Sequence, residues 1–570
     1  MADIRVYHPS IGDDIELKTP LDDWTEGRIV ALDDVDPSRV RVRYHGMSAE
    51  WDTWHSLDSD TVRWDDPPPL PPSVPAEEES RRRPFAFHCA YNGVDVTEGA
   101  MIDALRARGL RRSLSRDKAC IFQWVPYSRI QWSRCLAGLM IGSGHYIHSD
   151  VGHKVTLFSA LRAVARRESP LDPTSPLGQC AASLVPIHTF DIEADPGALT
   201  RRLPALVGGG AAWVLKADSA NNATAVHFVS ECTLPALLPL LRDAERGILG
   251  SGFAAGASHH ARWLLQKHVS QPLLVAGRKF HLRVNVLAHG SLALYVHREC
   301  VAHICVERYD AADLANEYSN VTNNAVQRHH AAFDAARNTL GMAELECAFA
   351  AERGEEEARR LVAALWSRIK AVVVGVFEGL WLASRSPAVP PGEEGSAGAA
   401  AGAGAPEQRK VRKIPFFPNC FEVYGFDFLP GDDGELYLLE VNVGPALEGH
   451  CKPAICKRVI DDVVRIVLDP LLASAAAAAE EAAAAAAAAA PPPPAPPSDA
   501  EVEARAEASR RALARAAESS EEETRFERVY FGRYDAMHRR AAAGGEGEGA
   551  APPMLWSPTL HARAVKWMNR

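Results

Sequence analysis

Two apolar segments separated by a turn, CFEVYGFDF at 420–428 and LYLLEVNV at 436–443, predict the most specific piece of structure in this sequence. The intervening PGDDGE is rich in turn-forming residues, so the pair predicts an antiparallel hairpin. Glu440 and Asn442 lie two residues apart and point to one face of their strand, which Asp427 can reach from the partner strand. Two carboxylates and an amide oxygen are hard ligands, which favour Mg²⁺ bound together with nucleotide phosphates.

The same three side chains could instead be polar positions of an edge strand that face water. Their flanking runs, GFDFL and LLEVNV, are otherwise apolar. Burying two carboxylates without a cation is costly, so we favour the metal site.

Four segments upstream combine strand-forming residues with isolated basic or amide side chains. They are AWVLKADS at 212–219, WLLQKHVSQPLLVAGRKFHLRVNVL at 263–287, ALYVHREC at 293–300 and YSNVTNNAVQ at 318–327. In this order, followed by the hairpin, they resemble the tubulin–tyrosine ligase and ligase-like family, a branch of the ATP-grasp enzymes. Five motifs in order are far more specific than any one of them. Weaker similarity at 147–163 extends the resemblance to roughly residues 120–470.

The resemblance implies an α+β fold of the ATP-grasp type and an ATP-dependent carboxylate–amine ligase with ATP and Mg²⁺ as cofactors. The magnesium ligands that it implies are Asp427, Glu440 and Asn442. The nucleotide contacts that it implies are Lys216, Gln266, Lys267, His268, Val269, Thr322 and Asn323. The catalytic cations that it implies are Arg283 and Arg298.

Ligases of this family phosphorylate a carboxylate, and an amine then attacks the acyl phosphate. Negative charge accumulates on the phosphoryl group during its transfer. Together with magnesium, Lys216, Arg283 and Arg298 would neutralise this charge in a site that excludes water.

Two departures from the family pattern fall in this site. After its phosphate-binding lysine the family usually has a proline and a glycine-rich loop, but residues 217–226 read ADSANNATAV and contain no glycine. Glycine lets backbone N–H groups approach phosphates closely. The family's Lys-Phe-Asp is Lys279-Phe280-His281 here, which replaces an acceptor-only carboxylate by a group that can also donate. Three hypotheses therefore stand: an active protein ligase, a catalytically weak or inactive adaptor, and an ATP-grasp ligase for a small molecule.

The N-terminal residues 24–64 combine tryptophans with short β-branched runs and acidic turns. This order resembles the Tudor-knot or chromo-barrel family, so we expect residues 1–66 to form a small all-β barrel. Many members of that family hold a methylated lysine in an aromatic cage, and the candidates here are Tyr44, Trp51 and Trp54. Alternatively, the tryptophans are simply the core of a very small domain.

The chain has 570 residues, more than one hydrophobic core usually organises. We expect the barrel at 1–66, a proline-rich and charged linker at 67–84, the ligase domain at 85–470, an Ala/Pro low-complexity tether at 471–498 and a helical segment and tail at 499–570. Inside the ligase domain, residues 387–408 are rich in Pro, Gly and Ala and predict a disordered loop. Isolated aromatic residues in the tail indicate either a segment that folds back onto the body or one that binds a partner.

The net charge of −11 argues against a general nucleic-acid binder. The scattered, odd number of 11 cysteines indicates reduced thiols, and because the N-terminal residues have no apolar core we expect no signal peptide. The apolar stretch near 361–383 is interrupted by Arg368 and Lys370, which favours a buried helix over a membrane span. We therefore expect a cytoplasmic protein without a membrane partner.

The family's substrate is the acidic tail of tubulin or another Glu-rich segment. We therefore expect a microtubule-associated protein; its Tudor-like module leaves the nucleus as an alternative. Two basic clusters flank the predicted site: Arg409, Lys410, Arg412 and Lys413, and Lys452, Lys457 and Arg458. These clusters either attract an acidic tail or are ordinary solvated charges. Which amino acid is added cannot be read from the residues.

Overall fold

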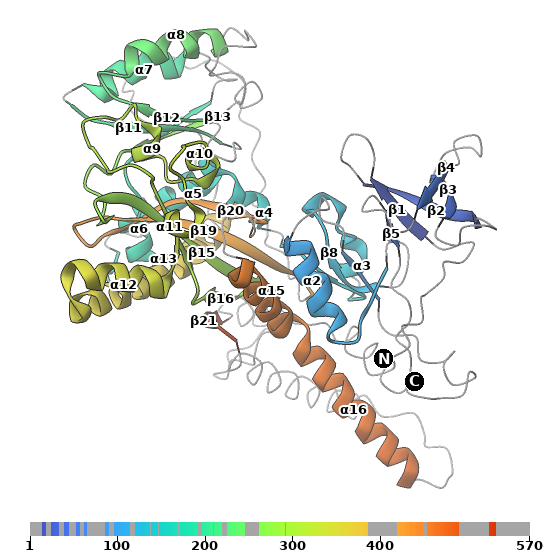
Figure 1. Ribbon diagram of the computed structural model, residues 1–570. Coiled ribbons are helices and arrows are strands. Elements are labelled where there is room, and N and C mark those ends of the chain that lie inside the picture. The colour runs from blue at the N-terminus through green and yellow to red at the C-terminus, as the bar shows by residue number, and fades with distance from the viewer. Residues whose placement is uncertain are drawn as a thin grey trace.

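The computed structural model shows a mixed α+β protein, in which sheets of different sizes pack against helices (Figure 1). It describes residues 14–18, 24–32, 39–44, 53–56, 62–64, 86–89, 96–113, 120–136, 138–145, 147–167, 171–191, 195, 197–208, 210–218, 225–245, 262–290, 292–385, 419–445, 447, 453–488 and 524–531. The expected loop at 387–408 and the expected helix at 499–520 lie outside these residues.

The N-terminal segment forms an antiparallel sheet with the strand order β4-β3-β2-β1-β5. Its strands are β1 (Asp14–Lys18), β2 (Trp24–Leu32), β3 (Arg39–Tyr44), β4 (Thr53–Ser56) and β5 (Val62–Trp64). In β3 the buried Val40 and Val42 alternate with the exposed Arg39 and Arg41, as expected for a strand with one face toward a core. The small β module is present, whereas its closure into a barrel stays a prediction.

A small parallel sheet with the order β7-β6-β8-β9 follows. Its strands are β6 (Ala86–Cys89), β7 (Arg111–Arg112), β8 (Cys120–Trp124) and β9 (Ile141–Gly142), and its helices are α2 (Val96–Arg106), η2 (Tyr127–Arg129) and α3 (Trp132–Leu136). Helix α2 buries Met101 and Leu105 in one hydrophobic core with Val459 and Val463 of helix α15 (Pro453–Val467). The parallel sheet is thereby joined to the C-terminal helix α15 through a shared core.

The central sheet carries the predicted hairpin. It consists of β14 (Leu274–Val275), β15 (Arg278–His289), β16 (Ala293–His297), β17 (Val301–Ile304), β18 (Thr339–Gly341), β19 (Phe421–Pro430), β20 (Leu436–Val443) and β21 (Phe526–Phe531). The long strand β15 pairs with β16 and β17 along one edge and with β19 along the other, and β20 pairs with β19. The antiparallel β19–β20 pair confirms the hairpin prediction.

Helices cover this sheet. They are α4 (His148–Gly152), α5 (Lys154–Arg167), α6 (Pro176–Ala182), α9 (Glu317–Asn320), α10 (Asn324–Gln327), α11 (Ala335–Asn338), α12 (Met342–Arg353) and α13 (Glu355–Arg385). In α13, Ile369, Val373 and Val376 recur at helical spacing and are buried in one core with Phe426 of β19. This confirms the expected buried helix. Among the described helices, none is both long and apolar enough to span a membrane.

An antiparallel sheet with the order β10-β13-β11-β12 lies beside the central sheet, at the top of Figure 1. Its strands are β10 (Ile187–Asp191), β11 (Trp213–Ala217), β12 (Val226–Val229) and β13 (Arg262–Lys267), and its helices are α7 (Ala198–Val207) and α8 (Leu234–Glu245). This sheet has a core of its own, in which Trp263 and Leu215 pack against Leu203 and Leu237 of the two helices. The two sheets are thus separate layers that can bind a ligand between them.

The alanine-rich tract differs from the expected tether at its start. Helix α16 (Asp469–Ala488) follows directly on α15, and Leu471 and Ala475 are buried in the core that α15 shares with α2. A run of alanines shows no amphipathic periodicity, so the sequence does not predict which face of the helix is buried. The small alanine side chain nevertheless lets a helix approach its neighbour closely. Of the two alternatives left open for the tail, residues 526–531 follow the first in this structure, since they form β21 beside β16.

Candidate nucleotide and metal site

A cavity of about 890 Å³ lies between the β10-β13-β11-β12 sheet and the central sheet. Its lining residues come from β11, β12, β13, β15, β19, β20 and the segment around α9 and α10. They include Lys216, Phe228, Gln266, Lys267, His268, Val269, Lys279, His281, Asn320, Thr322, Asn323, Asp427, Tyr437 and Glu440. Nine of the residues predicted from the sequence to bind nucleotide or metal therefore line one cavity.

The three predicted metal ligands meet on the β19–β20 hairpin. Asp427 pairs with Glu440 and Gly425 pairs with Asn442, and the register shifts between Asp427 and Phe428. Asn442 Nδ2 donates to Oδ2 of Asp427 at 3.1 Å. Period-two geometry thus brings both carboxylates and the amide together, as the sequence predicts.

Cations surround the two carboxylates. Lys154 Nζ lies 3.1 Å from Oε2 of Glu440. Burial opposes ionisation of Glu440, but Lys154, Lys216 and Arg283 outweigh it and hold its pKa at about 2. Arg283 binds both oxygens of Asp427, with Nη2 donating to Oδ2 at 2.9 Å. A carboxylate that stays ionised at neutral pH, a second one beside it and an amide oxygen fit a hard divalent cation. Among the described residues, no three or more His, Cys, Asp or Glu side chains are grouped so that they could hold a metal ion.

Lys216, on β11, is almost fully buried and points toward the hairpin. Its ammonium donates to Oε1 of Gln266 at 2.8 Å and to the backbone oxygen of Leu439 at 3.3 Å. Burial lowers the pKa of Lys216 to about 8, although Glu440 opposes the shift. At pH 7 the cavity therefore holds a poorly solvated cation that a phosphate group can neutralise.

Four of the predicted nucleotide contacts, residues 266–269, lie at the end of β13 or directly after it. Gln266 Nε2 donates to the backbone oxygen of Leu438 at 3.2 Å, which links the two sheets. The amide N–H of His268 donates to Ala212 O at 2.9 Å. Burial, with a smaller contribution from Lys279, lowers the pKa of His268 to about 3, so its ring is neutral.

Thr322 and Asn323 also line the cavity. Thr322 Oγ1 is 2.6 Å from Nδ1 of His281, and Asn323 caps α10 by accepting from the backbone N–H of Ala325 at 2.8 Å. Burial lowers the pKa of His281 to about 3, and the charge on Arg283 adds to the shift. His281 therefore contributes a neutral ring where the family has a carboxylate, and its Nε2 lies 3.8 Å from Asp427 Oδ1.

The two predicted catalytic arginines lie in different places. Arg283 is buried on β15 and lies behind Asp427 rather than on the cavity wall. Arg298 follows the last residue of β16, its side chain is 68% exposed, and its Nε lies 3.7 Å from Glu527 Oε2 of the C-terminal strand. The structure does not bring Arg298 to the cavity, because pairing of β16 with β21 engages it at the outer edge of the sheet.

Two lysines of the site were not predicted. Lys154 begins α5, within the segment 147–163 whose similarity is weak, and on a helix a lone lysine is normally solvated. Lys279 lines the cavity, and burial lowers its pKa to about 8. Its ammonium lies 5.7 Å from the ring centre of Phe228 and 5.6 Å from that of Tyr309. Lys279 could have been predicted as a site residue, because it is the first residue of the Lys-Phe-His segment that corresponds to the family's Lys-Phe-Asp.

A second cavity, of about 640 Å³, lies further along the hairpin. Its residues are Thr97, Trp124, Tyr127, Ser143, His148, Glu422, Val423, Gly444, Pro445 and Leu447. Glu422 accepts from the hydroxyl of Tyr424 and the amide of His145, both at 2.9 Å, and forms an ion pair with His148. Tyr127 stacks on the His148 ring with 4.1 Å between their centres.

Gly425 of β19 lies close to the side chains of Arg283 and Pro445. A Cβ atom on Gly425 would lie 3.0 Å from both side chains, so a larger residue here would require them to shift. Val423 and Asp427, two residues to either side, line the second and first cavities respectively. The cavities thus lie along one face of β19.

Other predicted sites are described only in part. The side chains of Tyr44 and Trp51 lie outside the described residues, as do 219–224 of the glycine-free segment and the basic cluster at 409–413. Trp54 is 41% exposed, and the guanidinium of Arg39 lies 5.7 Å from its ring centre, so this aromatic face already holds a cation of the same chain. Arg458 is bound to Glu299 at 2.8 Å.

Part of this chain is similar to known proteins. Residues 209–392 and 397–475 match the Tubulin-tyrosine ligase family. The chain is 26% identical over 212 residues to Probable tubulin polyglutamylase TTLL2 of Homo sapiens, covering 36% of this chain and 30% of that protein. It is 24% identical over 227 residues to Tubulin glycylase 3C of Tetrahymena thermophila, covering 37% and 18%. It is 26% identical over 218 residues to a probable tubulin–tyrosine ligase of Schizosaccharomyces pombe, covering 37% and 43%.

The matched region spans less than half the length of each of these relatives. Among solved structures, the C-terminal domain of Pby1 from K. lactis, an ATP-grasp enzyme, aligns with 68% of this chain and 94% of that chain, at 16% identity and a TM-score of 0.42. Residues 209–392 and 397–475 are thus similar to the Tubulin-tyrosine ligase family, and the first cavity lies largely within this matched region.

Proposed function

We propose that this chain is an ATP-dependent ligase that joins a free amino acid to a carboxylate of an acidic protein tail, with tubulin as the acceptor. One observation carries the proposal. Lys216 and Lys279 line a cavity whose carboxylate Glu440 also binds Lys154, at the hairpin that holds Asp427. Buried ammonium groups beside ionised carboxylates fit a magnesium-bound triphosphate.

In the first step, an oxygen of the acceptor carboxylate attacks the γ-phosphorus of ATP, the bond to the β,γ-bridging oxygen breaks, and ADP leaves. In the second step, the amine nitrogen attacks the acyl carbon, phosphate leaves, and the amine loses a proton to solvent. Lys216 and Lys279, both charged at pH 7, would neutralise the transferring phosphoryl group. No nucleophilic side chain of the protein is needed.

Asp427, Glu440 and Asn442 would hold the magnesium ion. Bound there, the ion would offset charge on the phosphate oxygens. Arg283 binds both oxygens of Asp427 and thereby fixes the orientation of this carboxylate. Arg283 is therefore a positioning residue in this proposal.

The second cavity is a candidate for one of the other two reactants. It shares the β19 face with the nucleotide cavity, since Val423 lines one cavity and Asp427 lines the other. The names of the relatives include a polyglutamylase, a glycylase and a tyrosine ligase. Glutamate, glycine and tyrosine are therefore the amino acids to test, and a tubulin acceptor would bring the protein to microtubules in the cytoplasm.

The test traps the proposed intermediate. Purified chain is incubated with tubulin, Mg²⁺ and ATP in the presence of hydroxylamine, which attacks acyl phosphates. We expect hydroxamate on tubulin and an equal amount of ADP, and loss of both with Glu440→Gln. ADP release that needs no acceptor and leaves no hydroxamate would contradict the acyl-phosphate route.

A non-catalytic adaptor is the second candidate. It is favoured by the position of Arg298 outside the cavity and by His281 in place of the family's carboxylate. Calorimetry separates the candidates, because an adaptor of this kind would bind tubulin but show no heat of binding with ATP and Mg²⁺.

A further inference from the structure

The C-terminal strand β21 comes from far along the chain and extends the central sheet (Figure 1). It pairs antiparallel with β16, from Ala293 opposite Phe531 to His297 opposite Phe526. The amide of Arg298 donates to the backbone oxygen of Arg525 at 2.8 Å and prolongs this pairing. The edge of β16 thus binds an extended segment by its main chain, as in strand addition.

One charge pocket lies beside this edge and holds Glu527. Lys370 of α13 forms an ion pair with Oε1, and Trp366 Nε1 of the same helix donates to Oε2 at 3.1 Å. Arg298 Nε lies 3.7 Å from Oε2. Three donors from α13 and the end of β16 therefore surround a single carboxylate.

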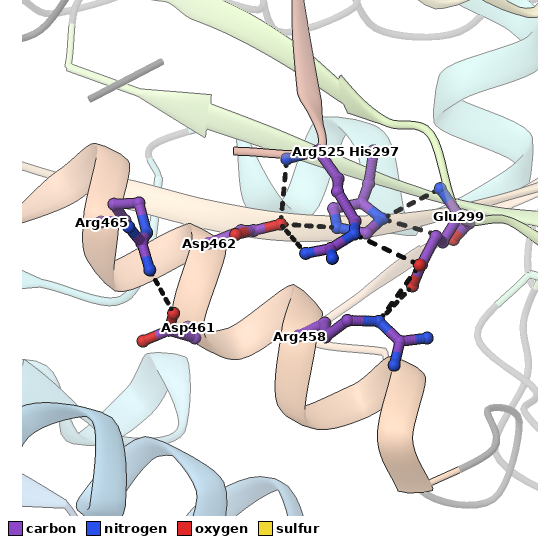
Figure 2. A network of polar contacts seen from close by, with 7 residues as sticks. All are labelled: His297, Glu299, Arg458, Asp461, Asp462, Arg465 and Arg525. Atoms are coloured by element: carbon purple, nitrogen blue, oxygen red, sulfur yellow. Dashed lines mark hydrogen bonds and ion pairs between the residues drawn. The ribbon is translucent and has the colours of Figure 1, made fainter. Parts of the chain in front are cut away.

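A second pocket, of opposite charge, holds Arg525 (Figure 2). Its amide donates to Oδ2 of Asp462 at 3.1 Å, and its Nε lies 3.4 Å from Oε1 of Glu299. Asp462 is buried on α15 and also contacts Nε2 of His297 at 3.2 Å. Glu299 is held in turn by Arg458 at 2.8 Å. The acidic pocket is therefore organised by its own neighbours, independently of the strand.

We propose that the edge of β16, between α13 and α15, is a peptide-docking surface for an extended Arg-x-Glu segment. The chain's own Arg525-Phe526-Glu527 occupies it here, and a partner protein with the same pattern takes it when β21 is released. Glu527, next to Val296 of β16, enters the pocket on the α13 side of the sheet, whereas Arg525, which immediately precedes β21, reaches the pocket on the α15 side. Opposite charges in a fixed order set both the register and the direction of the bound segment.

Exchange is physically accessible at this edge. The side chains of Arg525 and Glu527 are 48% and 29% exposed, so solvent partly screens their ion pairs and breaking them costs less than breaking fully buried pairs. Release of β21 leaves β16 with unpaired backbone groups, which are a template for another strand. A tethered strand competes at an effective concentration on the order of millimolar, so a partner must bind more tightly or meet a released strand.

A charge swap tests the surface in the full chain. Arg525→Glu with Glu527→Arg keeps composition and net charge but puts each charge into the wrong pocket. The probes are three fluorescent peptides. The native peptide has the sequence of residues 524–531, and the charge-swapped peptide exchanges its Arg525 and Glu527. The threonine peptide keeps Arg525 and Glu527 and has threonine at every other position. Anisotropy measures their affinities for the wild type and for the swapped chain.

We expect the swapped chain to bind the native peptide at least tenfold more tightly than the wild-type chain does. Its affinity for the threonine peptide should lie within tenfold of its affinity for the native peptide. Adding Lys370→Gln should weaken this binding about tenfold. Arg360→Gln on the same helix, whose ion pairs lie with Glu356 and Glu357, should not. Equal affinities of the native and charge-swapped peptides, or no binding of the threonine peptide, would overturn the proposal.

Hydrogen exchange on the wild-type chain gives a second measurement if the swapped chain does not fold. Amides of 526–531 should exchange at least a hundredfold faster than those at the centre of β15, because the strand opens separately. Equal exchange in the two strands would mean that β21 leaves only on global unfolding, and the docking surface would be refuted.

Discussion

The buried lysines predict a specific pH dependence of ATP binding. Burial lowers the pKa of Lys216 from 10.5 to about 8, and Lys279 shifts to the same value. A bound triphosphate supplies the missing negative charge and should return each pKa toward its ordinary value. At 1.36 kcal/mol per pKa unit, full recovery for one lysine corresponds to about 3 kcal/mol, or roughly a hundredfold in affinity.

The sign of the effect is opposite for binding and for folding. ATP affinity should not change with pH below pH 8. Between pH 8 and 10, deprotonation of each lysine should lower it by up to tenfold for every pH unit. Without ATP, the unfolded chain keeps each lysine proton up to about pH 10.5, whereas the folded chain releases it near 8. The contribution of these lysines to the free energy of unfolding should therefore rise with pH across that window.

Calorimetry of ATP with Mg²⁺ between pH 7 and 9.5 measures this slope. Lys216→Arg is the informative variant, because its guanidinium stays charged over this whole pH range. Only Lys279 would then titrate, so the slope of log affinity against pH should be half that of the wild type. A wild-type affinity that does not change between pH 8 and 9.5, or a Lys216→Arg slope equal to the wild type, would refute the reasoning.

Three further substitutions test other parts of the account. Glu440→Gln should weaken binding of ATP with Mg²⁺ at least tenfold in calorimetry while metal-free ATP binds as well or better, since one negative charge is lost; equal weakening of both forms would contradict a metal role. His281→Asp places a third carboxylate near Asp427 and should weaken metal-free ATP about tenfold while tightening Mg²⁺ in titrations; the reverse order would count against it. In Gly375→Ala, the new Cβ would lie 2.3 Å from the backbone oxygen of Pro176. Urea unfolding should show a loss of about 1–3 kcal/mol, whereas Gly99→Ala, with open space around it, should show no loss.

The sequence predicts the hairpin well because its signals are local. Alternation places Asp427, Glu440 and Asn442 on one face, and the turn between the strands sets their pairing. Lys216 and Gln266 are predicted by their order among the motifs, and their side chains are in contact in the structure. These are positions at which neighbouring residues determine the outcome.

Long-range contacts account for what the sequence does not predict. Lys154 contacts Glu440 from helix α5, which is far from the hairpin in the sequence. The residues around Lys154 do not distinguish it from a solvated lysine. Arg298 holds its expected place in the motif order, but pairing of β16 with a C-terminal strand turns it toward Glu527. Neither contact can be deduced without the packing of distant segments.

The central claim is that this cavity couples ATP to ligation, and mass spectrometry of tubulin tests it most directly. Tubulin is incubated with ATP, Mg²⁺ and glutamate, glycine or tyrosine, together with wild-type chain or Asp427→Asn. The account predicts a mass increase by whole amino-acid residues with one of the three, one ADP formed for each residue added, and neither product with Asp427→Asn. Unchanged tubulin with all three amino acids, or equal addition by Asp427→Asn, would contradict it.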